Sequence, residues 1–326
     1  MTTTVLPQLK VKAAEPIALA VLDGLSAQPR HLPPWLFYDR AGSRLFDEIT
    51  ELPEYYLTRT ERGILAAHAD AMTTQAAEGK RLRIVELGAG SADKTRLLLK
   101  AAVAQQGAVR YEPVDVSSSA LEAARERIER EIAGVSVVPR VMDYTQGLDL
   151  APEGPDERRL VLYIGSSIGN FEPHQADALL RGVRAGLRPG DALLLGVDLA
   201  KAPATLLAAY DDAAGVTARF NLNMLARLNR ELEADFDLES FAHRAEWNPL
   251  ESRMEIYLES LAAQRVRVAA LDLALDFAAG ERIHTENSYK YRPGQAEDLL
   301  SRANFAPVQT WTDAQGWFVV CLGRAA

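Results

Sequence analysis

The chain has 326 residues, of which 48% are apolar and 25% are charged, the proportions of an ordinary globular protein. They exclude collagen-like, disordered and disulfide-stapled chains, and the length suits one large domain or two ordinary ones. With 36 basic against 45 acidic residues the formal net charge is −9, and we expect no nucleic-acid binding because neutralising phosphates needs clustered cations.

Two aromatic segments lie near the start of the chain, each interrupted by proline. The first runs from Pro34 to Asp39 and contains Tyr38, and the second runs from Leu52 to Leu57 and contains Tyr55. Such side chains either pack in the core at a domain boundary or line a ligand pocket. The residues alone leave both interpretations open.

Five short apolar segments alternate with helical patterns between residues 80 and 200. The predicted strands are 82–87, 109–115, 135–138, 159–165 and 191–198, and the predicted helices are 93–103, 117–132 and 175–187. Continuous apolar strands indicate a sheet that is covered on both faces. With helices as crossovers, the pattern predicts parallel strands in a Rossmann-like α/β fold.

The pattern changes after residue 200. A run of helices is predicted at 206–215, 219–233 and 238–245, followed by strands with one solvated face at 252–260 and 265–269. Strands at 308–311 and 317–323 predict a hairpin at the edge of the sheet. We therefore expect an α/β domain of residues 62–200 and 290–326. Residues 1–61 and 201–289 are expected to pack together as a second domain over its ligand edge.

The chain holds one cysteine, Cys321, in an apolar run, and we expect a buried structural thiol. Its five histidines lack metal-ligand spacing, so no metal is expected. No apolar stretch approaches the ~18 residues of a membrane span, and the N-terminus lacks the parts of a signal peptide. These features predict a cytoplasmic protein without a membrane partner, and we expect a monomer.

The end of the first predicted strand, Glu86-Leu-Gly-Ala-Gly90, predicts a ligand loop at the carboxyl edge of the sheet. Gly88 and Gly90 let the backbone approach a ligand, and the N-terminus of the following helix adds a positive partial charge. Asp115 ends the second strand, where a carboxylate can bind the hydroxyls of a ribose, and Asp143-Tyr144 follows the third. Three adjacent loops of this kind indicate an adenosine ligand.

The choice among adenosine compounds depends on two acidic residues. A dinucleotide loop has glycine at the position of Asp93, and an acid there is unfavourable beside a pyrophosphate. Glu86 suits the ammonium group in the methionine part of S-adenosylmethionine (SAM). The residues therefore favour SAM over NAD, and ATP is disfavoured because no phosphate-loop lysine motif occurs.

Two further segments carry polar groups that suit a substrate. The fourth strand ends in Gly165-Ser-Ser-Ile-Gly-Asn170, where the Asn170 amide either forms a turn or binds a carboxylate or an amine. Glu286 and Ser288 lie in Thr285-Glu-Asn-Ser288, where the chain is predicted to re-enter the α/β domain, and they suit a polar ligand ring.

Ordered motifs along almost the whole chain resemble those of the histidine-specific SAM-dependent methyltransferase family, which includes the L-histidine Nα-methyltransferases of ergothioneine biosynthesis. They are Phe37-Tyr-Asp39, Gly42-Ser-Arg-Leu-Phe-Asp47, Leu52-Pro-Glu-Tyr-Tyr56, Thr58-Arg-Thr-Glu61, Glu86-Leu-Gly-Ala-Gly90, Val114-Asp-Val-Ser117, Gly165-Ser-Ser-Ile-Gly-Asn170, Gly196-Val-Asp-Leu199, Tyr210 and Thr285-Glu-Asn-Ser288. The resemblance implies a Rossmann-like class I SAM-dependent methyltransferase sheet with a second, α+β substrate-binding domain.

The resemblance also implies roles for single residues. It implies SAM contacts from Gly88, Lys94, Asp115, Asp143 and Tyr144, to which the residues themselves add Glu86 and Gly90. It implies that the substrate carboxylate or amine is held by Tyr55, Asn170 and Tyr210, and the imidazole by Glu286 and Ser288. Tyr38 is expected to line the pocket, and Tyr38 and Asn170 are the expected catalytic residues.

The implied reaction is the transfer of methyl groups from SAM to the α-amine of L-histidine, ending at the trimethylated betaine hercynine. Asn287 stands where an apolar residue is expected between Glu286 and Ser288, and it alters the choice of substrate only if its side chain faces the pocket. Methylation of another amino acid or small amine therefore stays open. An NAD-dependent enzyme and a SAM-binding module without catalysis also stay open.

Overall fold

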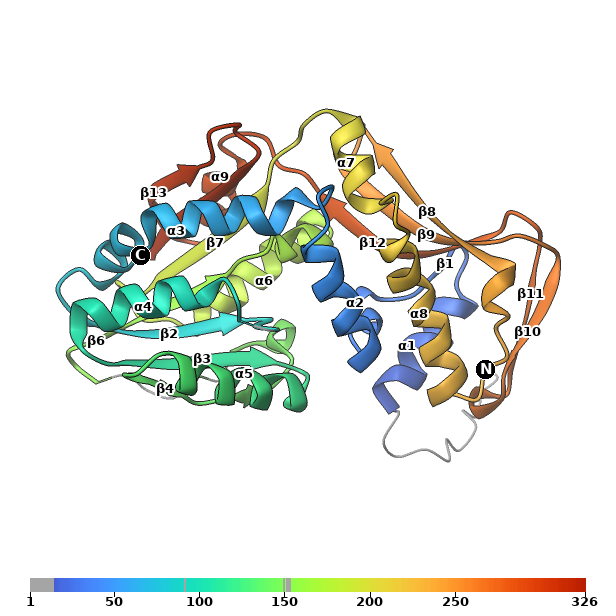
Figure 1. Ribbon diagram of the computed structural model, residues 1–326, viewed down its shortest axis with the longest axis horizontal. Coiled ribbons are helices and arrows are strands. Elements are labelled where there is room, and N and C mark those ends of the chain that lie inside the picture. The colour runs from blue at the N-terminus through green and yellow to red at the C-terminus, as the bar shows by residue number, and fades with distance from the viewer. Residues whose placement is uncertain (1–14, 91, 149, 151–153) are drawn as a thin grey trace, which may run out of the picture. The chain divides into compact units, whose positions relative to one another are not determined.

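The computed structural model describes residues 15–90, 92–148, 150 and 154–326 (Figure 1), so residues 1–14 of the predicted second domain lie outside it. The chain divides into two compact units. Unit 1 comprises Met1–Tyr56 and Lys201–Tyr289, and unit 2 comprises Leu57–Ala200 and Lys290–Ala326. The first change of unit falls between residues 56 and 57, where we expected it between 61 and 62, because helix α3 (Tyr56–Ala77) runs unbroken through the expected boundary.

Unit 2 is built on a mostly parallel sheet with the strand order β13-β14-β7-β6-β2-β3-β4, and β5 beside β3. The parallel strands are β2 (Arg81–Leu87), β3 (Val109–Asp115), β4 (Val135–Val137), β5 (Arg140–Val141), β6 (Glu157–Tyr163) and β7 (Ala192–Asp198). The hairpin of β13 (Phe305–Thr312) and β14 (Phe318–Ala325) adds two antiparallel strands at one edge. The expected α/β sheet and the expected edge hairpin are therefore both present.

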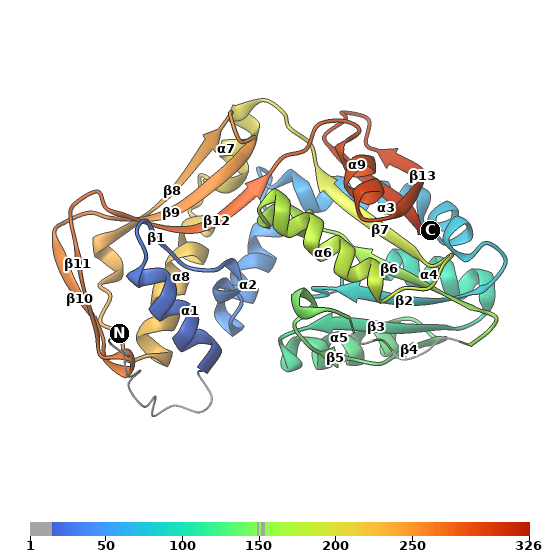
Figure 2. The same ribbon diagram turned by 180° about the vertical axis from the view of Figure 1, so that it is seen from behind.

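Helices cover both faces of this sheet, which explains why its strands read as unbroken apolar runs. One face packs against α3, α4 (Thr95–Gln106) and α5 (Ser118–Glu131), through buried residues such as Leu65, Leu98 and Ile128 (Figure 1). The other face packs against α6 (Pro173–Ala185) and α9 (Gln295–Arg302) through Leu180 and Leu299 (Figure 2). The sheet therefore lies between two apolar cores, one on each face.

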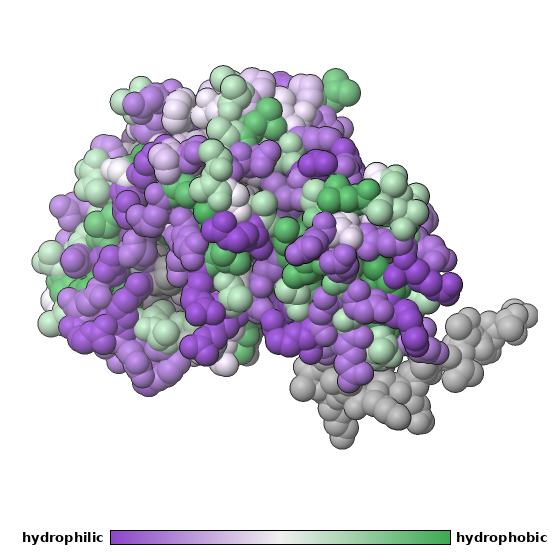
Figure 3. All heavy atoms as spheres, turned by 45° about the vertical axis from the view of Figure 1, so that its right-hand side comes forward, coloured by the Kyte–Doolittle hydropathy of each residue, from purple (hydrophilic) through white to green (hydrophobic). Residues whose placement is uncertain are grey.

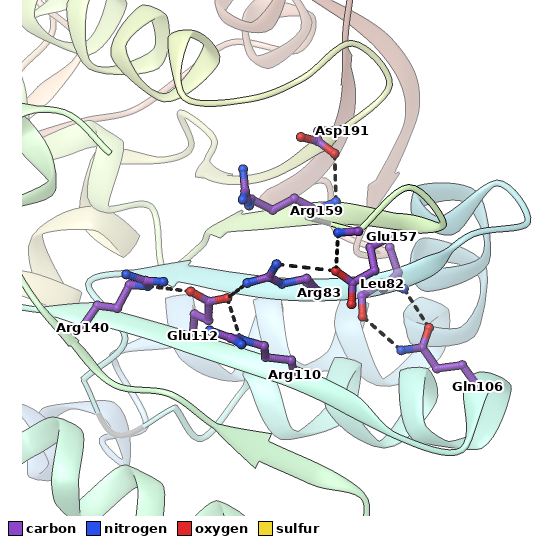
Figure 4. A network of polar contacts seen from close by, with 10 residues as sticks. Leu82, Arg83, Gln106, Arg110, Glu112, Arg140, Glu157, Arg159 and Asp191 are labelled. Atoms are coloured by element: carbon purple, nitrogen blue, oxygen red, sulfur yellow. Dashed lines mark hydrogen bonds and ion pairs between the residues drawn. The ribbon is translucent and has the colours of Figure 1, made fainter. Parts of the chain in front are cut away.

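Buried charges cross-link the strands of unit 2 (Figure 4). Glu112 on β3 is 1% exposed and receives Arg83 of β2 and Arg140 of β5, each at 2.5 Å. Burial by itself raises the pKa of Glu112, but these two arginines bring it below its ordinary value. Asp191, just before β7, accepts hydrogen bonds from the backbone N–H groups of Arg159 and Arg188, both at 2.9 Å.

Unit 1 combines a small sheet with helices, as expected for an α+β domain. The sheet has the order β1-β12-β9-β8, and a separate hairpin pairs β10 with β11. Its strands are β1 (Arg30–His31), β8 (Phe241–Asn248), β9 (Arg253–Ser260), β10 (Gln264–Val268), β11 (Leu273–Phe277) and β12 (Arg282–Tyr289). Its helices are α1 (Glu15–Ser26), α2 (Arg40–Thr50), α7 (Pro203–Tyr210) and α8 (Val216–Glu231).

The predicted helix at 238–245 is wrong, since this segment forms a single 3-10 turn followed by strand β8. Phe241 and His243 are buried at alternate positions, and all eight residues of β8 pair with β9 in antiparallel register. Alanines and a glutamate in the segment favour helix locally, but pairing with a distant strand overrides that preference. Strands β11 and β12 were not predicted from the sequence.

Cys321 lies on β14 and is fully buried, which confirms the expected structural thiol, and burial raises its pKa to about 11. Among the described residues, no helix is long and apolar enough to cross a membrane. On the face drawn in Figure 3, hydrophilic residues predominate and apolar residues are scattered between them, as the composition leads one to expect.

Candidate functional site

The loop after β2 presents backbone at the carboxyl edge of the parallel sheet. Gly88 and Gly90 have φ angles of 65° and 49°, in the left-handed region that glycine adopts without strain. A Cβ atom built on Gly88 would lie 3.5 Å from the phenol oxygen of Tyr144. A side chain at position 88 would therefore meet Tyr144 of the loop after β5, and glycine leaves that space open.

Asp115, the last residue of β3, and Asp143, which follows β5, lie at the same carboxyl edge of the sheet. Asp115 accepts hydrogen bonds from the backbone N–H groups of Gly90 at 3.3 Å and Ser117 at 2.9 Å. Because Asp115 pairs with Val141 in the parallel register of β3 and β5, Asp143 emerges beside it. The structure thus brings together five predicted cofactor residues, which are Gly88, Gly90, Asp115, Asp143 and Tyr144. Carboxylates around an open glycine backbone fit the ribose and base of an adenosine ligand.

Glu86 lies deeper than the sequence suggested. Its side chain is buried, and its carboxyl group accepts hydrogen bonds from the hydroxyls of Thr95, at 2.6 Å, and of Tyr111. Burial raises its pKa to about 7, although both hydroxyls act in the opposite direction. Glu86 therefore ties β2 to β3 and to the start of α4, and a contact with a ligand ammonium stays a prediction.

Lys94 is paired with Glu61, which ends one of the motifs quoted from the sequence but for which no role was predicted. Its ammonium group forms an ion pair with Glu61 of α3, whose side chain is fully buried. The Glu61 carboxylate also accepts the backbone N–H of Gly165, at 2.8 and 2.9 Å to its two oxygens. The sequence did contain a signal for its burial. Glu61, Ile64 and Leu65 are spaced at i, i+3 and i+4, which places all three on the buried face of α3.

Asn170 follows β6 in a compact loop. Gly165 and Ser166 both have positive φ angles, 84° and 58°, and residues Ser167–Asn170 form one 3-10 turn. Ser166 is buried, and its hydroxyl accepts the backbone N–H of Asp198 at 2.9 Å. Asn170 itself is half-buried in unit 2, at the end of a loop that is anchored at its start.

The predicted substrate residues of unit 1 form an aromatic and polar cluster. The hydroxyl groups of Tyr210 and Ser288 are 2.8 Å apart and hydrogen bonded, which joins the end of α7 to strand β12. The Tyr55 ring meets the Tyr210 ring edge to face, with 6.4 Å between centroids. Tyr38 reaches the same group through Phe46, whose ring lies 5.7 Å from that of Tyr38 and 6.3 Å from that of Tyr55.

Neighbouring residues of β12 face opposite sides of the sheet. Side chains alternate along a strand, so Glu286 and Ser288 share one face and Asn287 lies on the other. The Asn287 amide oxygen is 2.8 Å from Nε2 of His284, a hydrogen bond on its own side of the strand. The unexpected amide at 287 is therefore turned away from the face that carries Ser288.

His243 of β8 lies beside this cluster, and the sequence reasoning gave it no role. Its Nε2 lies 2.8 Å from the carbonyl oxygen of Tyr210 and its Nδ1 lies 2.9 Å from the Asn221 amide nitrogen. These partners fit a neutral ring that donates from Nε2 and accepts at Nδ1. Burial lowers the pKa of His243, in keeping with a neutral ring.

Similarity to known proteins extends over both units. A profile of the family described as "Histidine-specific methyltransferase, SAM-dependent" matches residues 17–325. The chain is 46% identical over 302 residues to the histidine N-alpha-methyltransferase of Mycobacterium tuberculosis, covering 93% of this chain and 92% of that protein. Identity to the protein of the same name from Mycolicibacterium smegmatis is 46% over 310 residues, 95% of each chain. Ergothioneine biosynthesis protein 1 of Neurospora crassa is 34% identical over 306 residues, which span 87% of this chain and 32% of that protein.

Proposed function

Because the chain belongs to the family of histidine-specific, SAM-dependent methyltransferases, we propose that it methylates the α-amine of L-histidine. The protein is a SAM-dependent L-histidine Nα-methyltransferase whose product is the trimethyl betaine hercynine, the first intermediate of ergothioneine biosynthesis. One observation carries this proposal: the chain is 46% identical to two histidine N-alpha-methyltransferases, over 93% and 95% of its length.

The carboxyl edge of the sheet in unit 2 would hold SAM. Asp115 binds the ribose hydroxyls, Asp143 and Tyr144 contact the adenine, and the backbone at Gly88 and Gly90 approaches the ligand closely. Lys94 and Glu86 lie toward the methionine part. SAM supplies a methyl group on a positively charged sulfur, which makes that carbon an electrophile. The hydrogen bond from Gly90 to Asp115 and the space that Gly88 leaves beside Tyr144 support this arrangement.

Different side chains are proposed to bind different groups of the histidine substrate. Tyr55, Asn170 and Tyr210 hold the carboxylate or the amine, and Glu286 and Ser288 hold the imidazole. A carboxylate that accepts an imidazole N–H is worth about 1.5–3 kcal/mol, and this contact is lost when the substrate is leucine or phenylalanine. Glu286 and Ser288 share a face of β12, which supports a joint role in recognising the ring.

Methyl transfer requires the amine in its neutral form, since the nitrogen lone pair attacks. A neighbouring positive charge disfavours the ammonium form, so the site lowers the pKa of the amine without a dedicated strong base. Most of the acceleration then comes from holding the amine and the methyl group in the reactive orientation. Orientation of this kind lowers the activation barrier by roughly 7–11 kcal/mol. In this proposal Tyr38 lines the pocket and its hydroxyl orients the amine.

The function is tested by incubating the protein with SAM and the twenty common amino acids and analysing the products by mass spectrometry. We expect histidine alone to gain the mass of three methylene units. Methylation of another amino acid or amine would replace the assigned substrate. No methylated product together with SAM binding would indicate a module without catalysis, and calorimetric binding of NAD in place of SAM would indicate an NAD-dependent enzyme.

A further inference from the structure

We propose that Glu61 is a positioning residue for methyl transfer, which holds the loop that carries Asn170 in register with Lys94. The inference depends on the proposed function, because the roles of Asn170 and Lys94 belong to it. Glu61 itself does not touch the substrate in this proposal. It acts on the reaction through the backbone of Gly165, and the ammonium group of Lys94 balances its charge.

The burial of Glu61 is the first observation. Its side chain has no exposed surface, and a charged carboxylate is costly to bury unless it is paired and hydrogen bonded. Both requirements are met, by Lys94 and by the N–H of Gly165 at 2.8 and 2.9 Å. The carboxylate therefore links three segments of unit 2 that are remote in sequence, namely α3, the loop after β2 and the loop after β6.

Two glycines make room for this link. A Cβ atom on Gly196, in the middle of β7, would lie 2.1 Å from Oε1 of Glu61, which no real contact allows. A Cβ atom on Gly165 would lie 3.2 Å from the Lys94 nitrogen, and Gly165 also has a φ angle of 84°. The carboxylate thus occupies a slot of fixed shape, with one strand on one side and the start of the Asn170 loop on the other.

The loop that Glu61 holds has little freedom beyond its start. Ser166 is in the left-handed region and is fixed through its hydroxyl to the N–H of Asp198, and the next four residues form the 3-10 turn that ends at Asn170. A shift of Gly165 would therefore be passed on to Asn170. Replacing a buried ion pair with apolar residues is often neutral for stability, so orientation of the loop is the role that requires a carboxylate here.

The test compares Glu61→Gln and Glu61→Ala with a matched control, Asp191→Asn. Like Glu61, Asp191 is a buried carboxylate that accepts backbone N–H groups in unit 2, but it stands before β7, at the opposite end of the strands. We expect kcat/KM for histidine at saturating SAM to fall about a hundredfold in Glu61→Ala, as for an ångström-scale misplacement. Glu61→Gln, whose side-chain oxygen still accepts from Gly165, should lose less, and Asp191→Asn should lower Tm while leaving kcat/KM within about threefold.

A double-mutant cycle with Asn170→Ala separates positioning from general damage. If Glu61 acts through Asn170, Glu61→Ala should cost less than about threefold in the Asn170→Ala background. Losses that multiply in the double variant would overturn the inference, and so would a Glu61→Ala enzyme with wild-type kcat/KM. Should Glu61→Ala not fold, Glu61→Gln is carried through the same cycle with the same criteria.

Failure of the proposed function is visible separately, in the wild-type protein. If the wild type methylates an amine other than histidine, the cycle is run on that amine and tests Glu61 alone. A wild type that methylates nothing contradicts both the function and the role of Glu61.

Discussion

The two polar regions of the molecule are constructed in different ways. In unit 2, the carboxyl edge of the sheet is a set of turns in which glycine backbone meets acidic side chains, as at Gly90 and Asp115. In unit 1, the cluster brings the loop residues Tyr38 and Tyr55 together with Tyr210 of α7 and Ser288 of β12, and Tyr210 and Ser288 are hydrogen bonded. The first region is specified by local sequence and the second by long-range pairing, and the two should respond differently to substitution.

The largest effect is expected in unit 2, from Asp115→Ala. In the proposed complex the Asp115 carboxylate accepts hydrogen bonds from the two ribose hydroxyls. Loss of these two bonds, worth about 3–6 kcal/mol together, should weaken SAM binding at least a hundredfold. Isothermal titration calorimetry with SAM measures this change. Asp177→Ala, which removes an exposed ion pair with Arg302, is the control and should bind SAM normally. Unchanged SAM affinity in Asp115→Ala would remove the ribose assignment.

Glu86→Gln should show how much the buried carboxyl group of Glu86 lowers the free energy of unfolding when it ionises. The folded state keeps Glu86 protonated up to a pKa of about 7, whereas the unfolded chain ionises near 4.5. Stability contributed by the protonated group is therefore complete below pH 4.5 and is lost as the pH rises toward 7, by about 3 kcal/mol. In urea unfolding without SAM, the free energy of unfolding of Glu86→Gln should rise relative to that of the wild type as the pH increases over this range. Parallel pH profiles for the two proteins would refute the shift.

Glu286→Ala tests the other region. Removal of one charge-assisted hydrogen bond to the imidazole should raise the KM for histidine by about ten- to a hundredfold. SAM affinity should stay at the wild-type value, since the loops of unit 2 are unchanged. Steady-state kinetics with histidine and calorimetry with SAM provide the two measurements. An unaltered KM would withdraw Glu286 from substrate recognition.

The effect of His243 on stability should depend on pH in the opposite direction to the effect of Glu86. Burial lowers the pKa of this histidine, so the folded protein disfavours its charged form while the unfolded chain takes up a proton near pH 6.5. The stability is therefore complete above pH 6.5 and is lost as the pH falls toward the folded-state pKa. In His243→Gln, unfolding experiments should show a smaller loss of stability on acidification than in the wild type. An equally steep loss in the variant would contradict the neutral assignment.

The smallest effect is expected from Asn287→Ala. The side chain bonds to His284 on the face of β12 opposite Ser288, so kcat/KM for histidine should change by less than about twofold. Competition between histidine and other amino acids should also be unchanged. A variant with altered amino-acid preference would show that residue 287 reaches the substrate after all.

Sequence reasoning succeeded where local chemistry determines structure. The apolar runs and the turn glycines are sufficient to predict β2, β3, β6 and β7 and to place Gly88 and Asp115 at one edge. It failed where distant pairing decides, because Phe241 to Ala245 has helical composition but forms β8 against β9. For the same reason, no role was predicted for Glu61 or His243. The spacing of Glu61 places it on the apolar stripe of α3, but its partner Gly165 comes from a remote segment, as does the Tyr210 carbonyl that His243 contacts.

The buried Cys321 makes the protein a convenient starting point for site-specific labelling. A thiol with a pKa of about 11 and no exposed surface is almost unreactive toward maleimides at neutral pH, because the thiolate is the nucleophile. Cysteines introduced at Leu250 of unit 1 and Val308 of unit 2, which are 93% and 42% exposed, would then be the sole reactive sites. A fluorescent probe attached at either position would report on one unit alone, with the native cysteine left in place.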